Sequence, residues 1–246
     1  MKHFFSLFIL GLKRRSKDFF ILFYNIVFPV IIILLLGYLS SKSYGNVFTS
    51  YNYYTIVIIP FCALMGIITV SYAAQDEKTF KTSYRFMTAP ITKIELILSK
   101  FFSCAIVLSL CNVITLVIGK LLFRLNFNGN FGAIVILLMA ETLMVTGIGL
   151  CLGLASKNLD TVRNLINLPI SIFGFLGGAF FPVGSLNSVL SGIINISPLT
   201  WVNRGIVACI YDNNFQILWT VTAIFIIVGI VFAYLTIKFF KKEAFL

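Results

Sequence analysis

The chain has 246 residues, of which 59% are apolar and only 11% are charged, and its formal net charge is +11. Soluble domains carry about 25% charged residues, so this composition excludes a soluble globular protein and indicates an integral membrane protein. The positive charge requires no nucleic-acid partner, because basic residues beside membrane spans meet anionic lipid headgroups at about 1 kcal/mol each.

Residues 1–18 combine an apolar run, Phe4 to Leu12, with a basic cluster, Lys13 to Lys17. A cleavable signal peptide has the reverse order, with positive charge before the apolar core, so we expect the segment to be retained. The apolar run is too short to cross a bilayer, which favours an in-plane amphipathic helix that turns at Lys17–Asp18 into the first span. A frayed basic tail is the alternative.

Six later stretches are long and apolar enough to be read as membrane spans, since about 20 residues cross a hydrocarbon core of about 30 Å. They lack the alternating pattern of barrel strands, so the predicted fold is all-α, with one transmembrane domain over residues 1–246. The predicted spans are Phe19 to Leu39, Tyr53 to Ala74, Phe101 to Phe123, Phe131 to Ala155, Ile166 to Phe181 and Phe215 to Ile237.

The basic residues predict the orientation of these spans. Most of the 19 Lys and Arg lie in the N-terminal segment, the connection 75–100, the fourth connection and the C-terminus, whereas the opposite face carries Lys42, Lys120, Arg124 and Arg204. The positive-inside rule therefore places both termini in the cytoplasm. Trp201 and Trp219 lie on the outer face, where they suit an interfacial aromatic belt.

The connection between the second and third spans, Gln75 to Lys100, is unusually polar for a chain of this kind. It begins with Asp76 and Glu77 and contains a turn marked by Ala89–Pro90. So much polar sequence on the cytoplasmic face of the membrane is most simply a docking element for another protein.

Glu141 lies near the midpoint of the fourth span, where a charged side chain costs at least about 2.5 kcal/mol unless it is paired or neutral. It is a candidate cation site, proton relay or polar lining of a cavity. The alternative is a protonated Glu141 that is hydrogen-bonded to Asn112 or Thr115 of the third span. These residue types leave both interpretations open.

Glycines in the fourth and fifth spans show the spacing of close helix contacts. Gly149 and Gly153 form one GxxxG pair, and Gly174 and Gly178 form another. Such pairs put small residues on one helix face. Packing within one chain and packing between chains both remain open.

The fifth stretch is short, and Pro182 interrupts it. Residues 182–200 are moderately apolar and broken by Gly and Pro, which predicts a re-entrant hairpin that enters the membrane from the outer face. Phe181, Pro182 and Pro198 are its candidate gate residues. The outer end of a substrate path is expected here.

Enzyme chemistry finds no support in the sequence. His3 is the sole histidine, which excludes HExxH metal sites and Ser–His catalysis, and no GxxxxGK[ST] phosphate loop is present. The five cysteines form no CxxC pair and are read as small buried hydrophobes. We therefore expect no metal, cofactor or catalytic residue in this chain, and any ATPase must be another polypeptide.

The order of these elements resembles the type-2 membrane permease of ATP-binding-cassette (ABC) exporters over almost the whole chain. Two stretches carry the resemblance. The first is the cytoplasmic loop, with Asp76–Glu77, Arg85, Ala89–Pro90, Glu95 and Lys100; the second is the outer motif, with Gly178, Phe181–Pro182, Leu186 and Ser197–Pro198–Leu199. Leu186–Asn187 departs from the Leu-Pro that is common in the family, which puts the turn of the outer hairpin in doubt.

The resemblance implies that Gln75 to Pro90 forms a coupling helix in a groove of a partner ATPase. The implied coupling residues are Asp76, Glu77, Lys81, Arg85 and Pro90. It also implies a second permease chain, identical or paralogous, and two ATPase subunits that bind ATP and Mg. Glu141 matches no family motif.

The expected function is export of hydrophobic or amphipathic cargo, such as a drug or an antimicrobial peptide, across a bacterial plasma membrane. Export of a polysaccharide or lipid-linked glycan is the second candidate within the family. An ion channel or ion-coupled carrier centred on Glu141 is the alternative from another class.

Overall fold

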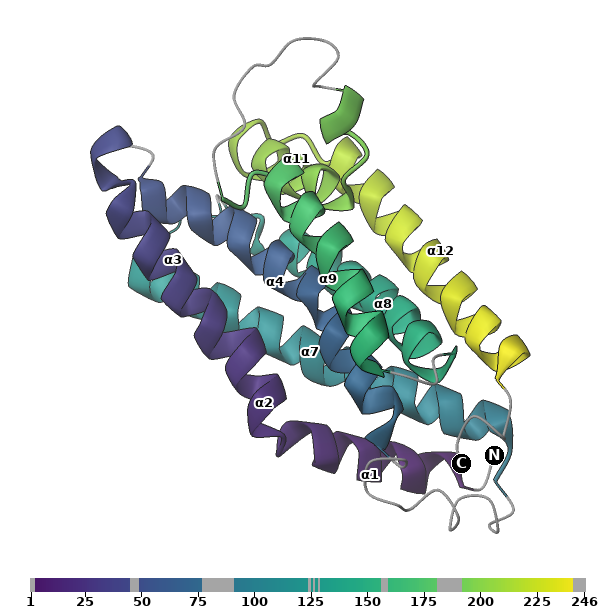
Figure 1. Ribbon diagram of the computed structural model, residues 1–246. Coiled ribbons are helices and arrows are strands. Elements are labelled where there is room, and N and C mark those ends of the chain that lie inside the picture. Colours follow the sequence, from purple (N-terminus) through teal and green to yellow (C-terminus); the bar gives the residue numbers. More distant parts are fainter. Residues whose placement is uncertain are drawn as a thin grey trace.

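The computed structural model describes residues 3–44, 49–76, 91–123, 125, 127, 129–155, 159–180 and 192–240. The described part of the chain is helical and contains no strand (Figure 1). Its elements are α1 (Phe4–Ser16), α2 (Phe19–Leu22), η1 (Phe23–Val27), α3 (Phe28–Leu39), η2 (Ser41–Ser43), α4 (Ser50–Ala74), α7 (Lys93–Phe123), α8 (Phe131–Ala155), α9 (Leu159–Leu176), α11 (Pro198–Tyr211) and α12 (Gln216–Phe239).

Five helical stretches in the described residues are long and apolar enough to cross a membrane, which confirms a multi-pass membrane protein. They are Phe19–Leu39, Ser50–Ala74, Lys93–Phe123, Phe131–Leu154 and Gln216–Phe239. The predicted fifth span corresponds to α9, whose apolar part, Asn164–Leu176, is shorter than these. The sixth crossing therefore stays a prediction.

The break between the N-terminal helix and the first span lies at Lys17–Asp18, as the sequence predicts. Asp18 caps α2, because its side chain accepts hydrogen bonds from the backbone N–H groups of Phe20, at 3.0 Å, and Ile21, at 3.4 Å. Such a cap satisfies donors that have no partner within the helix. The first span then runs through α2, the π-helical turn η1 and α3 without a gap.

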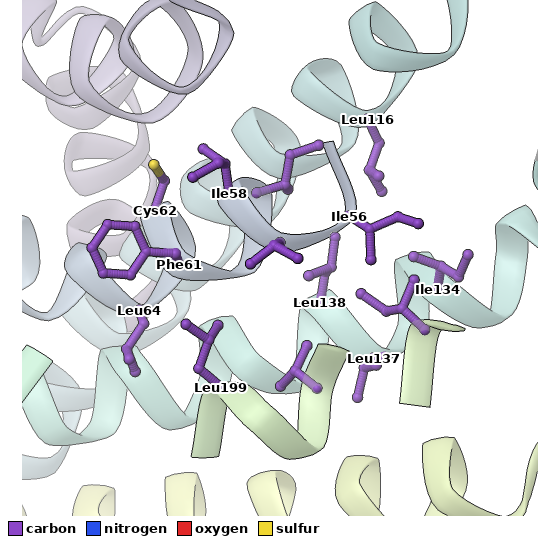
Figure 2. Packing of buried hydrophobic residues seen from close by; sticks show 14 of the residues in the cluster. Ile56, Ile58, Phe61, Cys62, Leu64, Leu116, Ile134, Leu137, Leu138 and Leu199 are labelled. Carbon is purple, nitrogen blue, oxygen red and sulfur yellow. The ribbon is translucent and has the colours of Figure 1, made fainter. Parts of the chain in front are cut away.

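Helix α4 lies at the centre of the bundle. In its most apolar window 89% of the residues are buried, against 22% in the first span and 28% in α12. Figure 2 shows side chains of α4 meeting side chains of α7, α8 and α11. The labelled members of this core are Ile56, Ile58, Phe61, Cys62, Leu64, Leu116, Ile134, Leu137, Leu138 and Leu199.

Glycines let α8 approach its two main neighbours closely. A Cβ on Gly149 would lie 2.7 Å from the Cβ of Val70 in α4, and one on Gly153 would lie 2.6 Å from the carbonyl oxygen of Ser71. On another side of α8, a Cβ on Gly147 would lie 2.6 Å from the carbonyl oxygen of Gly229 in α12. Small residues therefore bring α4, α8 and α12 to backbone contact.

The structure describes only the end of the predicted hairpin, residues 192–200, so the hairpin stays a prediction. Residues 181–191, including Phe181 and Pro182, lie outside the described residues. Pro198, however, begins a regular helix, α11, that the sequence analysis did not predict and that continues well past residue 200. Its buried residues, such as Leu199, Val202 and Ile206, recur at helical spacing and join the main core.

Candidate coupling site

The described residues reach the start of the predicted coupling segment. Gln75 and Asp76 are described, whereas Glu77, Lys81, Arg85 and Pro90 lie outside the described residues. Helix α4 ends at Ala74, so Asp76 lies just beyond its carboxyl end. The roles assigned to these side chains remain predictions, but the surroundings of Asp76 are defined.

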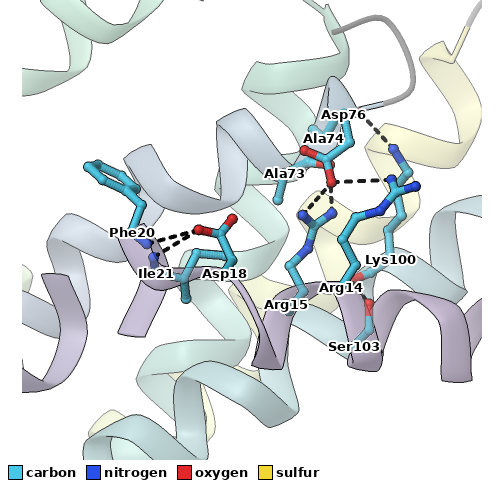
Figure 3. A network of polar contacts seen from close by, with 10 residues as sticks. All are labelled: Arg14, Arg15, Asp18, Phe20, Ile21, Ala73, Ala74, Asp76, Lys100 and Ser103. Carbon is cyan, nitrogen blue, oxygen red and sulfur yellow. Dashed lines mark hydrogen bonds and ion pairs between the residues drawn. The ribbon is translucent and has the colours of Figure 1, made fainter. Parts of the chain in front are cut away.

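Asp76 is paired with the N-terminal helix. Its Oδ2 lies 2.5 Å from Nη1 of Arg15 and 3.4 Å from Nη1 of Arg14. Figure 3 shows both guanidinium groups reaching from α1 toward this carboxylate. Arg15 is only 3% exposed, whereas the Arg14 side chain is 30% exposed. The Arg15–Asp76 pair is therefore the buried member of the network.

Two cations also bind the last backbone carbonyls of α4. Nη2 of Arg15 donates to the carbonyl oxygen of Ala73 at 2.9 Å, and Nζ of Lys100 in α7 donates to that of Ala74 at 2.7 Å (Figure 3). The last carbonyls of a helix have no partner within it and carry the negative end of the helix dipole. Arg15 and Lys100 therefore donate hydrogen bonds to the last carbonyl oxygens of α4, and their positive charges also stabilise the negative end of its helix dipole.

Helix α8 holds the same end of α4. Nε2 of Gln75 donates to the carbonyl oxygen of Gly153 at 2.7 Å, and Oγ of Ser71 donates to that of Gly149 at 3.1 Å. We name the set Arg14, Arg15, Gln75, Asp76 and Lys100 the α4 anchor. It ties the end of α4 and the first two residues of the predicted coupling segment to α1, α7 and α8.

The charge on Arg15 is stable in this setting. Burial lowers the pKa of the guanidinium, but the Cys104 thiol and the Asp76 carboxylate outweigh that effect, and the pKa is raised above its ordinary value. A buried ion pair of this kind adds little net stability while it is intact. Removing one partner is costly, because the other charge is left buried without compensation.

The sequence analysis assigned the cations of the anchor differently. It placed the basic cluster of α1 among lipid headgroups, whereas Arg15 is buried against α4 and Lys100 is only 6% exposed. The pairing of Arg15 with Asp76 spans 61 positions in sequence, and no local pattern reports a contact at that separation. The sequence offered one indirect signal. The chain has only 8 Asp and Glu for 19 Lys and Arg, so each acidic side chain is a candidate partner for a buried cation.

The intramembrane candidates Glu141 and Asn112 are both buried, at 1% and 4% exposure. Oε2 of Glu141 and Nδ2 of Asn112 each lack a hydrogen-bond partner. Oγ1 of Thr115, the other proposed partner, donates instead toward the carbonyl oxygens of Asn25, at 3.1 Å, and Cys111, at 2.9 Å. The hydrogen bonds predicted to satisfy Glu141 are thus not formed by these atoms.

The remaining predicted residues lie along α8, α9 and α11. Gly149 and Gly153 face α4 within the chain, and a Cβ on Gly174 would lie 2.5 Å from the ring of Phe61 in α4. Gly178 lies beyond the end of α9 with φ +80°, so it does not share a helix face with Gly174. Pro198 occupies the first turn of α11, where its missing N–H costs nothing.

Comparison with protein families gives one match. The family model described as ABC-2 type transporter matches residues 2–211, which include every described helix from α1 to α11. No curated protein matches the chain. Membrane domains of this family are permease subunits of ABC transporters, which are generally non-catalytic and work with an ABC ATPase subunit. The chain therefore belongs to the ABC-2 type transporter family.

Proposed function

We propose that the chain is the permease subunit of an ATP-driven exporter whose ATP and Mg are bound by separate ATPase subunits. The observation that carries this proposal is the α4 anchor. It fixes the end of α4 and the first two residues of the predicted coupling segment, Gln75 and Asp76, to α1, α7 and α8. A push on that segment from an ATPase would therefore reach several helices together.

The proposed orientation places the anchor at the cytoplasmic face of a bacterial plasma membrane. Helix α1 supports this, because it exposes apolar side chains, including Phe5 (69%) and Ile9 (61%), next to exposed Lys13 and Lys17. An apolar face beside basic residues suits the boundary between headgroups and acyl chains. In this arrangement α1 lies in the plane of the membrane and both termini are cytoplasmic.

We further propose that two permease chains, identical or paralogous, enclose the transport path, with two ATPase subunits below. Helix α9 exposes the apolar residues Leu165, Leu168, Ile172 and Phe175, and we assign this face to the second chain. The cargo is hydrophobic or amphipathic, such as a drug or an antimicrobial peptide. A polysaccharide or lipid-linked glycan is the second candidate.

The experiment for this proposal is co-purification with the ATPase. A tagged chain co-expressed with a candidate ABC ATPase from the same genome is expected to retain that ATPase in detergent. The charge reversals Glu77→Lys and Arg85→Glu should weaken that retention and lower ATP-dependent export, because both residues lie in the predicted coupling segment. A chain that never retains the ATPase, together with unchanged export in both variants, would contradict the coupling role.

Glu141 gives a sharp test against an ion-coupled carrier. Glu141→Gln keeps the size of the side chain and removes its ability to ionise. The proposed ATP-driven exporter does not depend on ionisation of Glu141, so its export activity should change by less than about twofold. An ion channel or carrier centred on Glu141 predicts ion flux into ATP-free liposomes that disappears in this variant. Measuring both activities on the same preparation separates the two functions.

A further inference from the structure

A groove of about 480 Å³ lies between α11 and α12. Its volume falls in the range of small-molecule sites, about 300 to 1,000 Å³. Val221 and Phe225 are buried at 3% and 4% exposure, whereas Ile196 and Ile224 are 69% and 51% exposed. The groove thus has an apolar floor and opens to the surface. Its lining residues are Ile196, Pro198, Trp201, Gln216, Ile217, Thr220, Val221, Ile224 and Phe225.

Two residues, Trp201 and Asn195, hold the guanidinium of Arg204 at the edge of this groove. Nε1 of Trp201 donates to the backbone oxygen of Asn195 at 2.8 Å, and Nη1 of Arg204 donates to the side-chain Oδ1 of Asn195 at 2.6 Å. The guanidinium carbon of Arg204 also lies 5.9 Å from the centre of the Trp201 ring. Arg204 is therefore held beside a residue that lines the groove, and it remains exposed.

The chemistry of the groove specifies an anionic amphiphile. A guanidinium carries five N–H donors in a planar fork that matches a phosphate, and the bond to Asn195 uses one of them. An apolar slot with a fixed guanidinium at its rim suits a molecule with an acyl chain and a phosphate. A positively charged headgroup would instead meet repulsion from Arg204.

The surroundings favour a lipid as the occupant. The neighbouring surface of α12 exposes Trp219 (47%), Ile227 (61%) and Ile230 (62%), as expected of a helix face in contact with hydrocarbon. The groove is lined by residues of α11 and of the first half of α12, and these parts of the two helices lie at the end of the bundle opposite α1 (Figure 1). This end corresponds to the outer leaflet in the proposed orientation. We propose that this groove binds an anionic phospholipid, with one acyl chain over Val221 and Phe225 and the phosphate at Arg204.

The chain contains two tryptophans, Trp201 and Trp219, which supply a reporter and a matched control. Trp201 lines the groove, whereas Trp219 lies on α12 outside it. The variant Trp219→Phe leaves Trp201 as the reporter, and Trp201→Phe leaves Trp219. Each protein is reconstituted in phosphatidylcholine vesicles that contain either brominated phosphatidylglycerol or brominated phosphatidylcholine, and quenching of the tryptophan fluorescence is measured.

Both lipids offer a phosphate, but only phosphatidylcholine brings a positive choline against Arg204, so Trp201 should show a preference of roughly fivefold for the anionic lipid, which corresponds to about 1 kcal/mol. Trp219 should show none. In the Trp219→Phe background, Arg204→Gln should abolish the preference, while Arg204→Lys should keep part of it and serves as the folding control. Equal quenching of Trp201 by both lipids, or a preference that persists in Arg204→Gln, would overturn the proposal. So would a Trp201 that neither lipid quenches, because a second chain or another segment would then cover the groove.

Discussion

Asp76→Asn is expected to destabilise the protein by about 3 to 5 kcal/mol, because it leaves Arg15 buried without its counterion. Asparagine keeps the size of the side chain and removes only the charge. Arg15 is 3% exposed and has no solvent into which its charge can relax. The contact between α1 and the end of α4 should therefore loosen, and ATP-dependent export should fall with it.

Arg14→Met is the matched control for this prediction. Arg14 adjoins Arg15 and also faces Asp76, but at 3.4 Å and with a side chain that is 30% exposed. Exposed pairs contribute about 0 to 1 kcal/mol, so Arg14→Met should have a small effect. Unfolding of the purified protein in detergent, followed by circular dichroism, measures both variants. Equal losses in Asp76→Asn and Arg14→Met would contradict the special role of the buried pair.

The single variant Arg15→Met and the double variant Arg15→Met/Asp76→Asn, measured together with Asp76→Asn, form a double-mutant cycle that isolates the interaction between the two residues. The double variant removes both charges and should recover part of the stability lost in Asp76→Asn, since a methionine fills the space with apolar atoms. If Asp76 instead contacts the ATPase, Asp76→Asn should weaken ATPase retention and leave the stability of the isolated chain unchanged. The two roles are therefore distinguished by which of these quantities changes.

The long spans could be predicted because hydrophobic length alone reports them. The first span, Phe19–Leu39, and α8 begin and end where the apolar runs do. Helix α7 begins at Lys93, whereas the predicted span begins at Phe101. The prediction missed the first turns of the helix because Glu95 and Lys100 interrupt their apolar sequence. Hydropathy alone does not predict polar turns at the end of a membrane helix.

Helix α11 was missed for a related reason. It is short, and Asn203 and Arg204 interrupt its apolar sequence, so it does not resemble a span. Ser197–Pro198 is nevertheless a helix-start signal, since serine is a common N-cap and proline fits the first turn. The contacts of the α4 anchor are a different case, because they join α1, α4 and α7 through tertiary packing that sequence spacing does not report.

Gly153→Ala is the second substitution for which we expect a large effect. It should lower the stability of the protein, although helix propensity alone predicts that alanine would raise it. Alanine is favoured over glycine inside a helix by about 1 kcal/mol, so a glycine without a packing role should tolerate it. A Cβ on Gly153, however, would lie 2.6 Å from the carbonyl oxygen of Ser71 and 2.7 Å from the Cβ of Ala74. Neither atom belongs to a flexible side chain, so the helices must separate, at a cost of about 1 to 3 kcal/mol.

The control for Gly153→Ala lies in the same helix. A Cβ on Gly132 would meet nothing within 4 Å, so Gly132→Ala should be neutral or slightly stabilising in the same detergent unfolding assay. Equal shifts in the two variants would show that the α4–α8 contact is not limiting. Because Gln75 donates to the carbonyl oxygen of Gly153, separation of α8 from α4 should also release the α4 anchor. Gly153→Ala is therefore expected to lower ATP-dependent export although it lies outside the coupling segment, and Gly132→Ala to leave export unchanged.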